Sequence, residues 1–131
     1  MMPTVLVVDD EPSYGTLISQ CANIRDMKAV FCEQSRDVKN ILQQYPSIKL
    51  IFLDVSMPEP DGFEVLELLV KLGFDGWVVM MSGFDPTLLM ASQEIASGYD
   101  LKLLPCLQKP FSIKSVDSVL VSYRDGRNLD S

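Results

Sequence analysis

Five polar residues of this 131-residue sequence lie just after short, mostly apolar runs. They are Asp9 and Asp10 after residues 5–8, Asp54 after residues 48–53, Ser82 after residues 77–81, and Lys109 after residues 103–108. Three carboxylates brought together would repel one another and raise each other's pKa values unless a cation lay between them. Oxygen ligands with room left for water and phosphate favour Mg²⁺ over softer metals. With a lysine as a positive charge and a serine hydroxyl as a donor, the set predicts phosphoryl transfer to a carboxylate nucleophile.

Each of these residues also has a simpler structural explanation. Asp10 could cap a following helix, because acidic side chains favour helix N-termini. Asp54 could serve in a turn, and Ser82 could cap a helix. Lys109 could be a solvated lysine at a turn, and the Asp-Gly pair at 61–62 fits turn chemistry. The argument for a site therefore depends on all of them meeting at one place.

The elements that must position these residues alternate between strands and helices. Strands are predicted at residues 5–8, 29–32, 48–53, 77–81 and 103–108. Helices are predicted at residues 13–25, 38–45, 63–72, 86–97 and 113–123. Gly73 and Gly98 should lie just past the ends of two helices, and Pro105 suits an edge strand or the start of a strand.

This alternation predicts a single doubly wound α/β domain of five β/α units. The runs at 5–8, 48–53 and 77–81 are apolar nearly throughout, as strands covered on both faces are. The sheet should therefore be parallel, five-stranded and flanked by helices on both faces. Ligands of such sheets bind outside the carboxyl ends of the strands, where the five polar residues are expected to meet.

Composition narrows the classes of function. Lys and Arg number 11 against 18 Asp and Glu, and the net charge of −7 disfavours direct binding to nucleic acid or membrane surfaces. The sequence has no histidine, which excludes catalytic triads and zinc sites built on imidazole. Cys21, Cys32 and Cys106 form no CxxC pair and are interpreted as buried thiols in a reducing compartment. The apolar runs are too short to span a bilayer and no signal peptide is apparent, so a cytoplasmic location is expected.

The chemistry-bearing residues lie in motifs that resemble the receiver domain of bacterial two-component response regulators. The motifs are Val-Val-Asp-Asp-Glu at 7–11, Leu-Asp-Val-Ser-Met-Pro at 53–58, Asp-Gly at 61–62, Ser-Gly at 82–83 and Lys-Pro-Phe at 109–111. The match runs from residue 4 to about 124, in the order and approximate spacing of that family. It implies a receiver domain at residues 1–124 and a polar, frayed tail or linker stub at 125–131. It also implies the strand order 2-1-3-4-5.

The resemblance implies a signalling switch, not an enzyme with a separate substrate. Asp54 would accept a phosphoryl group from a partner histidine kinase or phosphotransfer protein, and the domain would catalyse its own phosphorylation and dephosphorylation. Asp10 would bind Mg²⁺ directly and Asp9 mainly through water, while Asp54 and the backbone carbonyl of Ser56 would complete the protein ligands.

Two further groups would couple that phosphoryl group to a change of shape. Lys109 would pair with the phosphoryl group and would precede a cis peptide bond to Pro110. Ser82 would move toward it, so that the face formed by the fourth helix, fifth strand and fifth helix signals to an output domain or downstream protein.

The sequence departs from the usual receiver pattern at three places. Cys106 stands three residues before the lysine, where Tyr or Phe is usual, and Gly83 stands where Ala is common. The span from Ser82 to Lys109 is a few residues longer than usual. These departures leave the phosphoacceptor chemistry intact but put the aromatic-coupled switch in doubt.

Three other functions fit the sequence less well than a signalling switch. A haloacid-dehalogenase-type phosphatase needs a second Asp two residues after its nucleophile, where this chain has Ser56. A flavodoxin-like nucleotide or flavin binder is disfavoured because no glycine-rich phosphate-binding motif is present. A degenerate receiver used only for binding is disfavoured because all five site groups are in place.

Overall fold

The computed structural model describes residues 3–56, 62–83 and 86–130, the side chains of a few helical residues excepted. The strands are β1 (Thr4–Val8), β2 (Lys28–Cys32), β3 (Leu50–Asp54), β4 (Trp77–Ser82), β5 (Lys102–Leu103) and β6 (Leu107–Gln108). The helices are α1 (Pro12–Ile24), α2 (Val38–Gln44, after a 3₁₀ turn at Ser35–Asp37), α3 (Gly62–Lys71), α4 (Pro86–Gly98) and α5 (Ile113–Asp130). Five alternating β/α units are thus present, as predicted, although the fifth strand is in two pieces.

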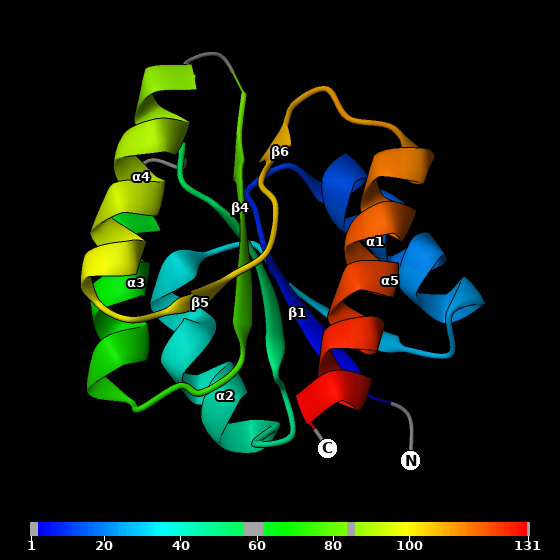
Figure 1. Ribbon diagram of the computed structural model, residues 1–131, viewed down its shortest axis with the longest axis horizontal. Helices are drawn as coiled ribbons and strands as arrows, with labels where there is room; N and C mark the ends of the chain where they lie inside the picture. Colours follow the sequence, from blue (N-terminus) through cyan, green and yellow to red (C-terminus); the bar gives the residue numbers. More distant parts are fainter. Residues whose placement is uncertain (1–2, 57–61, 84–85, 131) are drawn as a thin grey trace.

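The strands form one parallel sheet in the order β2-β1-β3-β4-β5, with β6 also paired to β4. Helices α1 and α5 cover one face of the sheet, and α2, α3 and α4 cover the other (Figure 1). The predicted doubly wound fold and strand order are both confirmed. Within the described residues, no helix is long and apolar enough to cross a membrane.

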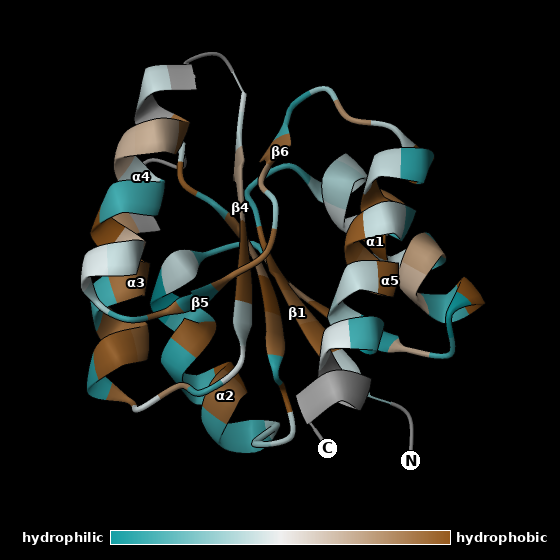
Figure 2. Cartoon of the chain, viewed as in Figure 1, coloured by the Kyte–Doolittle hydropathy of each residue, from teal (hydrophilic) through white to brown (hydrophobic). Residues whose placement is uncertain are grey.

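Alternation along the strands divides the core between the two faces of the sheet. In β1, Val5 and Val7 pack with α1 and α5, whereas Leu6 and Val8 pack with α2, α3 and α4. The middle strands are apolar along nearly their whole length, as Figure 2 shows, because both of their faces are covered. A residue that continues a strand therefore points to the same face of the sheet as the residue two positions before it.

The fifth strand is interrupted, so the prediction of one continuous strand over 103–108 is wrong. Val78 pairs with Leu103 and Met81 pairs with Leu107. These two pairings are three residues apart along β4 but four residues apart along the neighbouring segment. One extra residue is accommodated as a bulge around Pro105, which is exposed and has no N–H to donate. Pro105 lies between β5 and β6 and in neither strand, so the prediction holds only in that this proline stands at the edge of the sheet and not in its middle.

The end of α4 also differs from the prediction. Gly98 is the last residue of the helix and does not lie past its end, and the left-handed residue that follows is Asp100, with φ of 61°. The N–H of Leu101 donates to the carbonyl of Ala96, which closes the helix end. Gly73 does take the left-handed conformation after α3, with φ of 69°, as predicted.

The polar end of the sequence is helical. Residues 124–130 continue α5 to Asp130, so the helix extends past the end predicted at residue 123. The structure has a cis bond between Lys109 and Pro110, as the resemblance implied.

Candidate functional site

The polar residues identified in the sequence lie at the carboxyl edge of the sheet. Because side chains alternate along a strand, Asp9, Asp54 and Lys109 point to the same face of the sheet. Asp54 is the last residue of β3 and shares the facing of Leu50 and Phe52, toward α1 and α5. Asp9 directly follows β1, and its N–H still donates to the carbonyl of Cys32, 3.1 Å away. Lys109 directly follows β6, and its N–H donates to the carbonyl of Ser82 at 2.8 Å. Backbone pairing therefore holds Asp9 and Lys109 in line with their strands.

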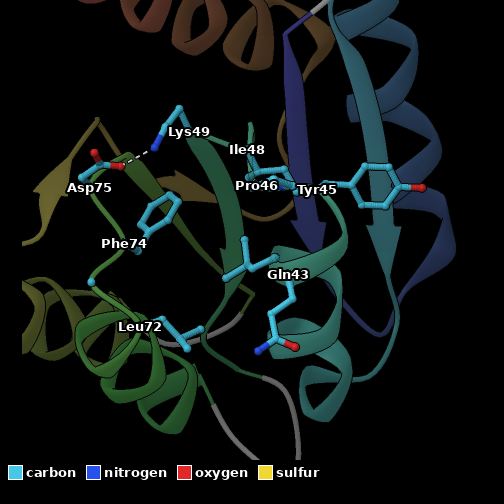
Figure 3. Close-up of a pocket in the computed structure, with 10 residues that line it drawn as sticks. Gln43, Tyr45, Pro46, Ile48, Lys49, Leu72, Phe74 and Asp75 are labelled. Carbon is cyan, nitrogen blue, oxygen red and sulfur yellow. Dashed lines mark hydrogen bonds and ion pairs between the residues drawn. The ribbon is translucent and has the colours of Figure 1, made fainter.

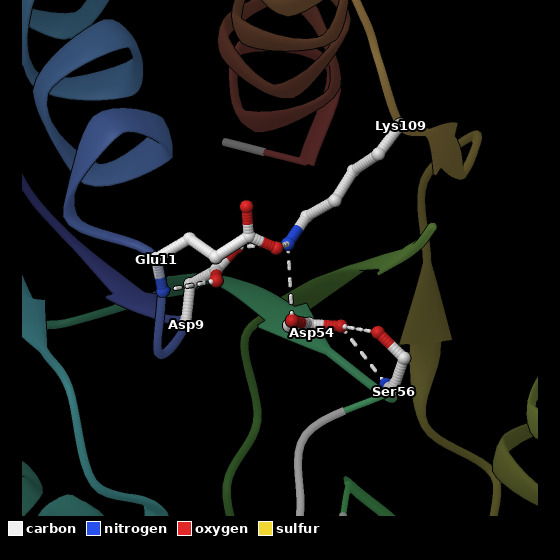
Figure 4. Close-up of polar contacts among 5 residues, drawn as sticks. All are labelled: Asp9, Glu11, Asp54, Ser56 and Lys109. Carbon is white, nitrogen blue, oxygen red and sulfur yellow. Dashed lines mark hydrogen bonds and ion pairs between the residues drawn. The ribbon is translucent and has the colours of Figure 1, made fainter. Parts of the chain in front are cut away.

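The ammonium group of Lys109 lies at the centre of this group of side chains (Figure 4). Lys109 Nζ is 2.8 Å from Asp9 Oδ2, 3.1 Å from Asp54 Oδ2 and 3.1 Å from Glu11 Oε1. The side chains of Lys109, Asp9 and Asp54 are 5%, 0% and 2% exposed, whereas that of Glu11 is 56% exposed. The site is thus a buried ion-pair network with one open side, where Glu11 meets solvent.

Both oxygens of the Asp54 carboxylate already have partners. Oδ1 accepts hydrogen bonds from the Ser56 N–H at 2.9 Å and from the Ser56 hydroxyl at 2.6 Å, while Oδ2 accepts one from Lys109. These contacts fix the plane of the carboxylate at the end of β3. A reacting group would therefore meet an oriented carboxylate oxygen beside a fixed positive charge.

The pKa of Asp9 is raised although its carboxylate contacts Lys109, so the single positive charge of this lysine does not offset the burial of Asp9 and the neighbouring negative charge. The pKa of Asp9 is raised to about 6, because burial and, to a lesser degree, the charge of Asp54 outweigh the opposing contacts of Lys109 and the Glu11 N–H. For Lys109, burial lowers the pKa, but the contacts with Asp9 and Asp54 outweigh it and raise the pKa overall. An additional cation near these carboxylates would relieve the cost of ionising Asp9.

Four carboxylates converge closely enough to share such a cation. Asp9, Asp10, Glu11 and Asp54 each offer an oxygen, and these oxygens all lie within 4.8 Å of one another. Asp10 is exposed, and Asp9 Oδ2 makes its ion pair with Lys109 but no hydrogen bond among the described residues. The donor set is entirely oxygen and carries four negative charges against one ammonium, which fits a hard divalent cation.

The two serines singled out in the sequence have different surroundings. Ser56 is exposed and its side chain bonds to Asp54. Ser82 is buried, and its hydroxyl has no hydrogen-bond partner in the described part of the chain. The backbone carbonyl of Ser82 accepts a hydrogen bond from the Lys109 N–H, so the end of β4 lies next to the site. The Ser82 hydroxyl makes no hydrogen bond with the acids or the lysine among the described residues. The predicted turn residue Asp61 lies outside the described residues.

Sequence reasoning missed two side chains that contact Lys109. Glu11 follows the acidic pair directly, and its position beside Asp10 was the only signal available. Tyr14, in the first turn of α1, places its ring centroid 4.3 Å from Lys109 Nζ. Its aromatic type alone carried no signal of a contact with a lysine 95 residues away. Of the three thiols, Cys21 and Cys32 are buried as predicted, but Cys106 is only half-buried.

A separate cavity lies at the opposite edge of the sheet, between the ends of α2 and α3 (Figure 3). It has a volume of about 220 Å³ and is lined by apolar side chains that include Leu42, Leu72 and Phe74. The ion pair between Lys49 and Asp75, at 2.5 Å, lies beside it. This cavity shares no residue with the carboxylate cluster.

Comparison with known sequences agrees with the geometry. A family model described as "Response regulator receiver domain" matches residues 5–120. The two-component response regulator ARR11 of Arabidopsis thaliana is 32% identical over 101 residues, which cover 75% of this chain and 19% of that protein. The nitrate/nitrite response regulator protein NarL of Escherichia coli K12 is 30% identical over 102 residues, covering 76% of this chain and 47% of NarL. The chain thus spans less than half the length of these curated relatives.

Solved structures agree on the fold. The signal receiver domain of a putative LuxO repressor protein from Vibrio parahaemolyticus superposes with a TM-score of 0.81 at 19% identity, covering 99% of this chain and 95% of that one. A CheY-like response regulator receiver domain protein from Methanospirillum hungatei gives a TM-score of 0.81 at 14% identity, with both chains fully covered. The family match, the fold and the buried acidic site at the carboxyl edge together show that this chain belongs to the response regulator receiver domains, the phosphoacceptor domains of two-component signalling.

Proposed function

We propose that Asp54 is the residue that accepts the phosphoryl group, in a reaction that depends on Mg²⁺. The observation that carries this assignment is the placement of its carboxylate, which is buried at the end of β3, 3.1 Å from Lys109 Nζ and within the cluster of four acids. Asp9 is equally buried, but its Oδ1 accepts the Glu11 N–H and its Oδ2 lies closest to Lys109. Asp54 also has the Ser56 hydroxyl as a movable partner, which can turn away when the carboxylate reacts.

The proposed reaction transfers a phosphoryl group from nitrogen to oxygen. A carboxylate oxygen of Asp54 attacks phosphorus, the P–N bond of a phosphohistidine breaks, and the imidazole leaves with the electron pair. This chain has no histidine, so the donor imidazole belongs to a partner histidine kinase or phosphotransfer protein. Attack of water on the resulting acyl phosphate releases inorganic phosphate and returns the Asp54 carboxylate, which ends the signal.

Lys109 and a bound Mg²⁺ would together neutralise the negative charge of the phosphoryl group. Lys109 pairs with an oxygen of the bound phosphoryl group, since its ammonium already lies beside Asp54 Oδ2. Asp10, Asp54 and the backbone carbonyl of Ser56 would hold Mg²⁺, and Asp9, whose Oδ2 contacts Lys109, would act through a water molecule. When bound, Mg²⁺ supplies positive charge to the phosphoryl oxygens during transfer.

The signal then passes through Ser82 to the face formed by α4, β5 and α5. The Ser82 hydroxyl is buried without a hydrogen-bond partner among the described residues, so a phosphoryl oxygen would give it one. Met90 and Ile95 on α4 and Tyr99 in the turn after it are 62%, 40% and 39% exposed, which supplies apolar surface for an output domain or downstream protein. We assign the receiver domain to residues 1–124, with a polar tail or linker stub at 125–131, and a cytoplasmic location stays a prediction from the sequence.

The experiment uses a small phosphodonor such as acetyl phosphate, with and without Mg²⁺. We expect a gain of one phosphoryl group by intact mass, lost on treatment with hydroxylamine, and no gain in Asp54→Asn. Asp125→Asn, an exposed change of the same type on α5, is the matched control and should be phosphorylated like the wild type. If Asp54→Asn gains as much phosphate as the wild type, the assignment fails. Unchanged Mg²⁺ affinity in Asp10→Ala would remove Asp10 from the ligand set.

A further inference from the structure

The side chain of Tyr14 is the one aromatic group that contacts the ammonium of Lys109 in the described part of the chain. Its ring centroid lies 4.3 Å from Lys109 Nζ, well within the range of about 6 Å in which a cation and an aromatic face attract each other. Tyr14 comes from the first turn of α1, three residues after Glu11. The ring therefore approaches Lys109 from the helix, whereas Asp9 and Asp54 approach it from the ends of β1 and β3.

A second aromatic ring holds Tyr14 in this place. The ring centroids of Tyr14 and Phe111 are 4.9 Å apart, with an angle of 43° between the planes, which is a favourable tilted arrangement. Phe111 follows Lys109 by two residues, so the pair of rings ties α1 to the segment that carries the lysine. Both rings are half-buried, which keeps water away from one side of the ammonium.

The ring contact differs from the carboxylate contacts in a way that matters for phosphoryl transfer. Lys109 has three N–H donors and contacts three carboxylates, Asp9, Glu11 and Asp54. An incoming phosphoryl group must take one or more of these donors. The face of Tyr14 attracts the ammonium without accepting one of its hydrogen bonds and without a formal negative charge that would repel the phosphoryl oxygens. The ring contact can thus persist while the acidic contacts exchange.

We propose that Tyr14 is a positioning residue for phosphoryl transfer, whose ring holds the ammonium of Lys109 beside Asp54 while the hydrogen bonds of that ammonium pass to the phosphoryl group. This inference depends on the proposed function of Asp54 and Lys109. The phenol hydroxyl has no part in it, so a phenylalanine at this position should serve equally well. With a side chain of similar volume but without a ring, the ammonium of Lys109 should be able to move away from Asp54 as its contacts with the carboxylates change.

The test compares Tyr14→Phe, Tyr14→Leu and Tyr14→Met with the wild type, using acetyl phosphate at saturating Mg²⁺. We expect the phosphorylation rate constant to fall about 2- to 30-fold in the Leu and Met variants, and to stay within about twofold in Tyr14→Phe. Mg²⁺ affinity, measured by titration calorimetry, should stay within about twofold in all three variants. Tyr45→Leu is the matched control, because Tyr45 faces Lys28 at 5.7 Å in a second cation–aromatic pair away from the site.

A spectroscopic measurement keeps the positioning role separate from a general loss of structure. The ε-methylene protons of Lys109 should show an upfield ring-current shift in the NMR spectra of the wild type and Tyr14→Phe, and should lose it in Tyr14→Leu. Equal rates in the wild type and Tyr14→Leu, or a Tyr14→Phe variant as slow as Tyr14→Leu, would overturn the role of Tyr14 and leave that of Asp54 standing. A wild type that gains no phosphate would overturn both proposals.

Discussion

The free energy of unfolding of the metal-free protein should respond in a specific way to the loss of the Asp9 charge. Burial and the charge of Asp54 raise the pKa of Asp9 from 3.8 to about 6 in the folded state, and each pKa unit corresponds to about 1.4 kcal/mol. Ionised Asp9 therefore costs the fold about 3 kcal/mol at neutral pH as an upper value. Asp9→Asn removes that charge but keeps an oxygen that can accept the Glu11 N–H. We expect the variant to be about 2 kcal/mol more stable than the wild type at pH 7 in EDTA.

The dependence on pH fixes the sign of this effect. Because the folded state holds the Asp9 proton more tightly than the unfolded state, the contribution of Asp9 to stability falls as pH rises from about 4 to about 6. It is constant above that range. The advantage of Asp9→Asn over the wild type should thus be small near pH 4 and fully developed by pH 7.

Urea denaturation followed by circular dichroism, in EDTA at several pH values, measures this difference directly. Glu67→Gln is the matched control, since it removes one negative charge from an exposed position on α3 and should change stability by less than about 0.5 kcal/mol. Mg²⁺ should stabilise the wild type by binding to the folded state, and should stabilise Asp9→Asn less, so the gap narrows. The reasoning is refuted if Asp9→Asn is less stable than the wild type at pH 7 in EDTA, or if their difference does not change between pH 4 and 7.

Three further outcomes follow from the packing of particular residues. Gly76→Ala should cost about 1–3 kcal/mol of stability by urea denaturation, because its Cβ would lie 2.3 Å from the backbone carbonyl oxygen of Lys49. Asp100→Gly should add about 0.5–1 kcal/mol, because it relieves the left-handed conformation after α4. With a thiol reagent at pH 8, Cys106 should react in the native protein before Cys32, whose burial and neighbouring Asp37 charge raise its pKa to about 11.

Each of these outcomes has its own control or contrary result. Gly98→Ala adds a Cβ to open space at the last residue of α4 and should stabilise the protein slightly, so a loss there equal to that of Gly76→Ala would contradict the steric argument. For Asp100→Gly, unchanged or lower stability would mean that the left-handed residue is not under strain. Mass mapping of the first labelled peptide decides the thiol prediction, and labelling of Cys32 first would contradict it.

Much of the site could be predicted from the sequence because it depends on where strands end. Parallel strands bring their carboxyl ends to one edge, so a residue directly after an apolar run is placed by topology alone. That is why Asp9, Asp54 and Lys109 meet as expected, with Asp10 close enough to share a cation. The chemical types of these residues then indicated the kind of reaction.

The bulge at Pro105 and the end of α4 depend on how segments pair and pack in the tertiary structure, which no local sequence pattern records. The bulge at Pro105 arises because β4 and its neighbour differ by one residue in length between two paired positions, and neither segment alone records that difference. The left-handed end of α4 falls on Asp100 and not on Gly98, because the packing of Leu101 and the sheet behind it decides where the helix must stop.

The sequence by itself determined the fold class, the strand order through its family resemblance, and the acids and lysine at the edge of the sheet. Only the tertiary structure decided that Glu11 and Tyr14 also contact Lys109, and that the Ser82 hydroxyl has no hydrogen-bond partner among the described residues. The physical reason is that strand ends are fixed by backbone pairing, which the sequence pattern reveals. The rotation of α1 over the sheet is fixed by the packing of its buried face against β2 and α5, where Ile18, Cys21 and Ala22 set which way Tyr14 points.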